Sequence, residues 1–144
     1  MTLSTSQILV RLLIAAGIGA LLGLEREVRR KSAGFRTNIL IAIGACIFTI
    51  VGMSFPSGDP ARVTAQIVTG IGFLGAGAIL HSGATVHGMT TAAMIWVNAA
   101  LGAAVGLGHF RLALIAGVLT LGVLLILGPV ERRIERGLPP PPTS

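Results

Sequence analysis

The sequence has little of what catalytic and metal-binding sites are commonly built from. It contains one cysteine, Cys46, which lies within an apolar run. A single thiol excludes an intrachain disulfide framework and a metal site built from several thiolates. Asp and Glu together number only 5. All of them fall at the ends of apolar segments or between them, which disfavours a site for a hard divalent cation that needs oxygen ligands.

Charge of either sign is also scarce, and apolar residues take its place. Charged residues make up 11% of the 144 residues and hydrophobic residues 53%, with a mean hydropathy of +0.87. This composition excludes a water-soluble domain. A bilayer accepts it, because a spanning helix needs about 20 mostly apolar residues. Five such stretches, at residues 5–24, 38–55, 62–81, 90–107 and 110–129, predict an all-α, polytopic transmembrane bundle of about five helices.

The basic residues predict an orientation for this bundle. The net charge of +6 would suggest nucleic acid in a soluble protein, but in a membrane protein basic residues gather on the cytoplasmic side. They cluster here in residues 26–36 and again in residues 132–136. We therefore expect the N-terminus outside and the C-terminus in the cytoplasm. The expected domains are a transmembrane domain at 1–131 and a basic, proline-rich cytoplasmic tail at 132–144. The first apolar stretch is expected to be retained, because it lacks a basic segment before it and a convincing cleavage site.

Small residues are the clearest packing signal. Helices in lipid associate through close backbone approach, so faces rich in glycine predict helix contacts within one subunit, between subunits, or both. Residues 34–52 can also be aligned with 88–106 without a gap, which suggests a parallel internal repeat. The glycines expected at contacts are Gly19, Gly23, Gly70, Gly72, Gly75, Gly77, Gly102 and Gly106.

Polar residues within the apolar stretches are candidate site residues, since burying them unpaired in hydrocarbon is costly. Gln66 and Thr69 share one face of the third predicted helix, and Thr91 and Asn98 share a face of the fourth. Two interpretations stay open. These side chains either hydrogen-bond between helices, or Gln66, Thr69 and Asn98 line a small polar cavity.

The helix ends offer a second set of candidates. A solvated, orienting charge cluster at residues 25–36 is one interpretation, and a Glu25–Arg36 pair with Thr37 and Thr91 capping adjacent helices is the other. On the opposite surface, Asp59 suits the N-cap of the third helix, Pro60 its first position, and Arg62 lies one turn along. The 3 histidines show no metal-ligand spacing, so no metal site and no cofactor are expected.

Several blocks of sequence, taken together, resemble the MgtC/SapB family. They cover the chain from about Gly23 to Gly108 in a consistent order. The blocks are Gly23-Leu24-Glu25-Arg26-Glu27, Ala33-Gly34-Phe35-Arg36-Thr37, Asp59-Pro60-Ala61-Arg62 followed by Ala65-Gln66-Ile67-Val68, Gly70-Ile71-Gly72-Phe73-Leu74-Gly75-Ala76-Gly77-Ala78-Ile79, and Gly88-Met89-Thr90-Thr91-Ala92-Ala93 with Trp96.

The resemblance implies a multi-pass protein of the bacterial inner membrane, connected with magnesium limitation, virulence and survival inside host cells. It also implies that such proteins modulate other membrane machinery. Longer members carry a soluble C-terminal domain, which is not expected in these 144 residues. Asn38 stands where many relatives are expected to have histidine, which argues against a proton relay at that position.

Two functional hypotheses from different classes follow. The first is a non-enzymatic regulator of magnesium or ion homeostasis that forms a homo-oligomer in the lipid bilayer and contacts other inner-membrane proteins. The second is a small-solute or ion transporter or channel, with its pathway along Gln66, Thr69 and Asn98. An enzyme is disfavoured because no nucleophile–base pair is visible. Candidate functional residues are Glu25, Arg26, Arg36, Thr37, Asp59, Arg62, Gln66, Thr69, Thr90, Thr91 and Asn98.

Overall fold

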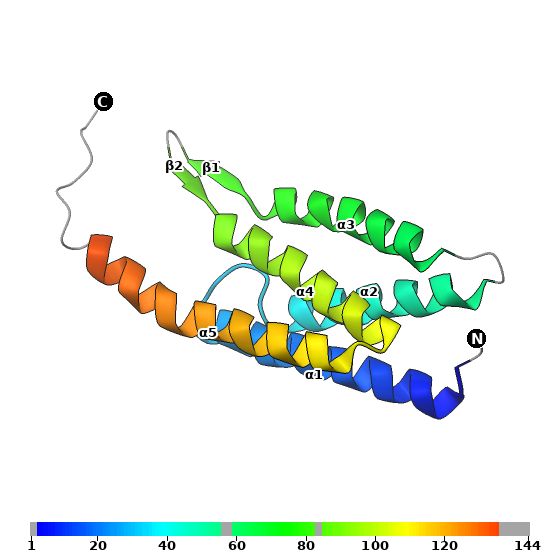
Figure 1. The fold of residues 1–144 in the computed structure, drawn as a ribbon. Helices are drawn as coiled ribbons and strands as arrows, with labels where there is room; N and C mark the ends of the chain where they lie inside the picture. Colours follow the sequence, from blue (N-terminus) through cyan, green and yellow to red (C-terminus); the bar gives the residue numbers. More distant parts are fainter. Residues whose placement is uncertain (1–2, 56–58, 83–84, 136–144) are drawn as a thin grey trace.

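The protein is an all-α bundle with one short β-hairpin, as Figure 1 shows. The computed structural model describes residues 3–55, 59–82 and 85–135. The helices are α1 (Thr5–Val28), α2 (Phe35–Ser54), α3 (Pro60–Gly77), α4 (Met89–Leu107) and α5 (Phe110–Glu135), and the strands are β1 (Leu80–Ser82) and β2 (Thr85–His87). The predicted all-α fold class is confirmed, and the expected helix boundaries are shifted by a few residues.

Four of the helices, α1, α2, α4 and α5, are long and apolar enough to cross a membrane. We expected five spanning segments, but α3, which is long enough, is not apolar enough to be counted with the other four among the described residues. Its first half explains the difference, because Arg62, Thr64 and Gln66 dilute the apolar residues there. In Figure 1, α3 nevertheless lies alongside α4, on the side of the bundle away from α1 and α5.

Local sequence signals account for the helix ends. Ser4 begins α1 with a capping box, in which its side chain accepts from the Gln7 N–H and the Gln7 side chain accepts from the Ser4 N–H. The predicted cap of α3 is confirmed, since the Asp59 side chain accepts from the Ala61 N–H at 2.9 Å and Pro60 follows. At the end of α4, Gly108 adopts φ +86°, a left-handed conformation that glycine enters without steric cost.

The centre of the bundle is formed by α1, α2 and α4. The most extensive contacts are those of α2 with α1 and with α4, while α3 and α5 lie outside this trio (Figure 1). Fully buried small residues, among them Ala15, Ala42 and Cys46, fill the central layer. The outer helices expose large apolar side chains, such as Phe73 of α3 and Leu119 of α5. Exposed apolar surface of this kind is expected where lipid replaces water as solvent.

The two ends of the bundle differ in the elements that they contain. The connector end holds residues 29–34, the β-hairpin and the end of α5, and the opposite end holds the starts of α1, α3 and α5 (Figure 1). β1 and β2 form an antiparallel hairpin, in which His81 pairs with Val86. α5 continues through Pro129 and past residue 131, the expected domain boundary, to Glu135. The expected polyproline segment, Pro139 to Pro142, lies outside the described residues.

The aligned segments 34–52 and 88–106 correspond to α2 and α4, which run in the same direction (Figure 1). Both helices follow a glycine N-cap, Gly34 and Gly88. Equivalent residues also meet each other, because Ile41 and Ala45 of α2 form one buried cluster with Ile95 and Ala99 of α4.

Candidate functional site

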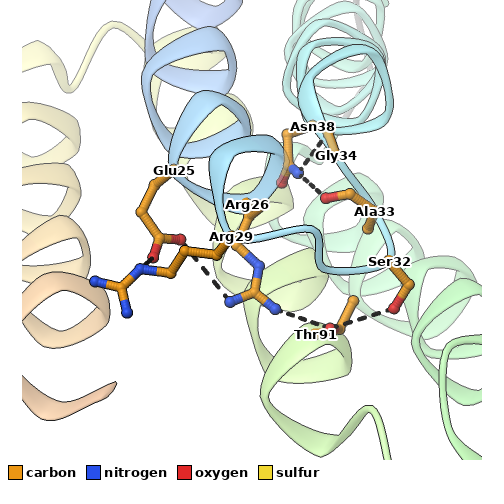
Figure 2. Close-up of polar contacts among 8 residues, drawn as sticks. All are labelled: Glu25, Arg26, Arg29, Ser32, Ala33, Gly34, Asn38 and Thr91. Atoms are coloured by element: carbon orange, nitrogen blue, oxygen red, sulfur yellow. Dashed lines mark hydrogen bonds and ion pairs between the residues drawn. The ribbon is translucent and has the colours of Figure 1, made fainter. Parts of the chain in front are cut away.

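A cluster of polar side chains, three of them buried, lies at the connector end, between the last turn of α1 and the first turn of α4 (Figure 2). We call it the Arg26 cluster, and it consists of Glu25, Arg26, Arg29, Ser32 and Thr91. Arg26 is 3% exposed, and its Nη2 donates to Thr91 Oγ1 at 2.9 Å. Ser32 Oγ donates to the same Thr91 oxygen at 3.5 Å, at the long limit of a hydrogen bond. Arg26 therefore ties α1 to α4.

Glu25 supplies the negative charge of the Arg26 cluster. Its Oε1 lies 2.6 Å from Nε of Arg29, and its Oε2 lies 3.9 Å from Nη1 of Arg26. The short contact with Arg29 is an ion pair whose geometry falls short of a directed hydrogen bond, since neither carboxylate oxygen has a hydrogen-bond partner within the described part of the chain. The Arg29 side chain also lies beside Gly128, so α5 covers this ion pair at the end of α1.

The backbone of the connector is wound tightly next to the cluster. α1 ends in a Schellman motif, with the Lys31 N–H donating to Arg26 O at 2.9 Å and Arg30 at φ +52°. Glu27 then reaches forward, and its Oε2 accepts from the Phe35 N–H at 3.0 Å, one of the donors left free at the start of α2. These bonds fix the distance between α1 and α2 at this end.

Asn38 and Asn98 form a second buried polar contact, one layer deeper in the bundle. Both residues are 0% exposed. Asn98 Nδ2 donates to Asn38 O at 2.6 Å and lies 3.2 Å from Asn38 Oδ1. Asn38 Nδ2 in turn donates to Ala33 O at 2.6 Å and Gly34 O at 2.9 Å, as Figure 2 shows. The pair links α4 to α2 and to the connector, which favours the interhelical interpretation of Asn98.

Some of the expected contacts at the connector end are wrong. Glu25 pairs with Arg29 and not with Arg36, which is exposed on the first turn of α2. Thr37 and Thr91 do not cap their helices, because the N-cap positions are Gly34 and Gly88. Glycine leaves these ends without a side-chain acceptor, and Thr91 is used by Arg26 instead. Thr37 and Thr90 are both exposed.

The predicted cavity along Gln66, Thr69 and Asn98 does not form. Asn98 is fully buried against α2, whereas Gln66 and Thr69 are exposed on α3. Thr69 Oγ1 donates to Ala65 O at 3.1 Å, within its own helix. Asp59 and Arg62 lie at the opposite end of the bundle from Glu25 and Arg36, as expected from the order of the helices (Figure 1).

The glycines singled out in the sequence fall into two groups. A Cβ atom added at Gly19 would lie 2.6 Å from Asn38 O, one at Gly23 would lie 2.9 Å from Phe35 Cα, and one at Gly106 would lie 2.8 Å from Thr49 Cβ. At Gly102 it would overlap the backbone oxygen of Ala42. These four lie where helices touch. At Gly70, Gly72 and Gly77 an added Cβ meets nothing within 4 Å, and at Gly75 the nearest atom is 3.7 Å away.

Sequence reasoning missed three residues that carry the polar contacts. Asn38 was noted only for its departure from the family pattern, although an amide at the start of an apolar run is the same signal that marked Asn98. Arg29 follows Glu25 by four residues, a spacing that favours an ion pair along a helix, so the sequence held a signal for it. Ser32 carries no local signal, because any hydroxyl of the connector could have met Thr91. At the opposite end, Arg11 donates to Gly106 O.

No metal centre is assembled from the described residues. Within the described ranges, no group of three or more His, Cys, Asp or Glu side chains is arranged to hold a metal ion. The only carboxylate in the Arg26 cluster is Glu25, and it lies between two guanidinium groups. A cation would have to compete with both guanidinium groups for this carboxylate, and the cluster joins α1 to α4 through Arg26 and Thr91.

Comparison with known proteins places this architecture in a family. The model of the MgtC family matches residues 12–133. Protein MgtC of Salmonella typhimurium strain LT2 is 44% identical over 128 residues, covering 89% of this chain and 55% of the relative. The Escherichia coli K12 protein named "Putative magnesium transporter YhiD" is 40% identical over 139 residues, covering 90% of this chain and 65% of the relative. No solved structure matches.

The chain thus spans between about half and two thirds of the length of these relatives. The match runs from α1 into the last turns of α5, so it includes every residue of the Arg26 cluster and the Asn38–Asn98 pair. Four helices apolar enough to span a bilayer, together with this match, identify a multi-pass membrane protein. The expected family is confirmed: the chain belongs to the MgtC family.

Proposed function

We propose that this protein is a non-enzymatic regulator linked to magnesium homeostasis, located in the bacterial inner membrane and acting through contacts with other membrane proteins. One observation carries the proposal. The buried side chains of Arg26 and Asn98 donate to Thr91 and Asn38 and so tie α4 to α1 and α2, while Arg26 Nε and Asn98 Oδ1 have no hydrogen-bond partner among the described residues. A transport pathway needs polar groups that face a passage, and the three residues expected to line one are separated between the surface of α3 and the core.

The link to magnesium rests on relatives. YhiD, 40% identical, carries a name that refers to magnesium transport, and MgtC of Salmonella is similar over the same part of the chain. The scarcity of buried carboxylates argues for an indirect role in magnesium homeostasis, since Mg²⁺ is bound through carboxylates, carbonyls and retained water. Glu25 is the one buried carboxylate among residues whose exposure is described, and arginines neutralise it.

Homo-oligomer formation is part of the proposal. Gly77 and the exposed Ala76 present small residues near the end of α3, where the single chain places no neighbour within 4 Å of a Cβ added at Gly77. Small faces without an intrachain partner are suited to contact with a second helix in the bilayer. α3 is also the least buried of the helices, since Gly75 is the only buried residue among its described residues.

Transport is the second candidate, favoured by the printed name of YhiD and by the open groove between α2 and α3. The regulatory and the transport function predict different results in a flux measurement. The protein, purified and reconstituted in liposomes with and without an ion gradient, is expected to pass no Mg²⁺ above the level of empty liposomes. Magnesium flux that depends on the protein would refute the regulatory proposal.

A growth experiment tests the role of the buried pair. The chain is expressed in a strain that lacks its own MgtC-family gene, and growth under magnesium limitation is normalised to the protein level in the membrane. Asn98→Leu roughly keeps side-chain volume and removes the donor to Asn38 O, so we expect stability and growth to fall together. Thr69→Val on the exposed face of α3 is the matched control. Full growth with Asn98→Leu would remove Asn98 from the functional residues.

A further inference from the structure

A groove between α2 and α3 opens on the surface of the bundle, with a volume of about 690 Å³. Its walls are almost entirely apolar, and the exposed Leu40 and Phe48 of α2 face it together with Leu74 of α3. Gly44 and Gly70 widen it, because an added Cβ at either position meets nothing within 4 Å. In a membrane-spanning chain such a groove is filled by something apolar.

The length of the groove indicates what fills it. The wall on α2 runs from Thr37 to Phe48, and the wall on α3 from Val63 to Leu74. At the helical rise per residue, each wall is about 17 Å long. The hydrocarbon of one leaflet is about 15 Å deep, half of a bilayer core. The groove therefore has about the length of one acyl chain, and it runs from the connector end to Val63, which lies one residue from Arg62 at the opposite end of the bundle.

The charge at the two ends of the groove is unequal. Thr37 begins it at the connector end, next to the exposed Arg36, and Arg30 and Lys31 are exposed in the connector. The two ion pairs among the described residues both use Glu25, and the Glu27 carboxylate accepts from a backbone N–H. The exposed cations at this mouth thus have no carboxylate partner within the described ranges. We propose that the groove binds one acyl chain of an anionic phospholipid whose phosphate lies at Arg36.

A second copy of the chain is the competing occupant, and the exposed cations at the connector end of the groove favour the lipid, because its phosphate is an anion. An acyl chain needs no polar partner, and Gln66 is the single amide on the walls. The proposal goes beyond the regulatory function and does not depend on it.

Lipid retention by the purified, full chain tests the proposal. Native mass spectrometry in detergent compares phosphatidylglycerol with phosphatidylcholine of identical acyl chains, added in equal amounts. Gly70→Leu fills the groove without meeting a neighbour, and Gly72→Leu on the same helix is its control, since it is equally open but does not line the groove. Arg36→Gln removes the charge at the mouth, and Arg111→Gln, exposed at the opposite end, is its control.

The expected pattern separates headgroup from acyl chain. Wild-type protein retains phosphatidylglycerol preferentially, and Arg36→Gln lowers that affinity by about fivefold, the effect of one basic side chain near an anionic headgroup. Gly70→Leu lowers retention of both lipids, and both controls bind as wild type does. Gly44→Leu, on the facing wall, repeats the test if the Gly70 variant does not fold.

Two results would overturn the proposal. One is that the Gly70→Leu variant retains as much of each lipid as the Gly72→Leu control does. The other is a change from oligomer to monomer in Gly70→Leu with unchanged lipid retention, which would assign the groove to a second copy of the chain.

Discussion

The contact between α4 and α2 at Gly102 should not tolerate a single added methyl group. An alanine Cβ at this position would overlap the backbone oxygen of Ala42 and lie 2.9 Å from its Cα and carbonyl carbon. Backbone atoms cannot rotate away as the tip of a side chain can. Gly102→Ala therefore requires the two helices to move apart, against the packing of Ala45 and Ala99 in the adjacent cluster.

The cost can be worked out by comparison with an open position. Gly102→Ala and Gly72→Ala gain the same helix propensity, but an added Cβ at Gly72 meets nothing within 4 Å. The difference between the two variants isolates the overpacking, which costs about 1–3 kcal/mol in a tightly packed interior. Gly75→Ala should behave as Gly72→Ala does, because its nearest contact is an ordinary 3.7 Å. This replaces the expectation from sequence that Gly75 and Gly102 are equivalent.

The free energy of unfolding is measured by titrating the detergent-solubilised protein with a denaturing detergent and following the fluorescence of Trp96, the single tryptophan. A substitution at Leu119, which is 66% exposed on α5, should leave the midpoint unchanged. Leu121 would not serve as such a control, because it packs against a buried cluster. Equal free energies for Gly102→Ala and Gly72→Ala would refute the packing argument.

The same assay and one labelling experiment test three further predictions. Asp59→Ala removes the side-chain acceptor at the start of α3 and should cost about 1 kcal/mol, while Asp59→Asn keeps most of the cap. Glu25→Gln leaves the buried Arg26 charge without its carboxylate and should cost about 3–5 kcal/mol, part of which returns when Arg26→Met is added; strictly additive losses would contradict the coupling. A cysteine at Arg30 should be shielded from an impermeant reagent in intact cells and one at Ala61 labelled, and the reverse result would overturn the predicted orientation.

Features that depend on neighbours in sequence could be predicted. The apolar stretches predicted the helices because a span of hydrocarbon length is visible in composition alone. The cap at Asp59 was also predictable, since an N-cap acceptor bonds within its own first turn. The strands β1 and β2 were not predicted, because strands this short are specified by pairing with each other and not by a hydrophobic period.

Partners that come from different helices could not be predicted in the same way. Asn98 could have met any helix beside α4, and only the fold brings the backbone oxygen of Asn38 to it. Thr91 was expected to cap α4, a local role, but an arginine on α1 reaches it across the bundle. The predicted polar cavity failed for a related reason: helical spacing gives the face of a side chain but not the neighbour to which that face is turned.

The α2–α4 contact shows why small and polar residues should not be interpreted separately. Asn98, Gly102 and Gly106 follow one another at four-residue intervals and so lie on one face of α4. They meet Asn38, Ala42 and Cys46 of α2 in the same order. The hydrogen bond from Asn98 to a backbone oxygen requires the two helix axes to be close, and the glycines of the next two turns permit that approach. What the sequence suggested as two signals, packing faces and a polar pathway, is one interface. A change at Gly102 therefore acts on the Asn98 bond as well, and the energies of substitutions at these two positions should not be additive.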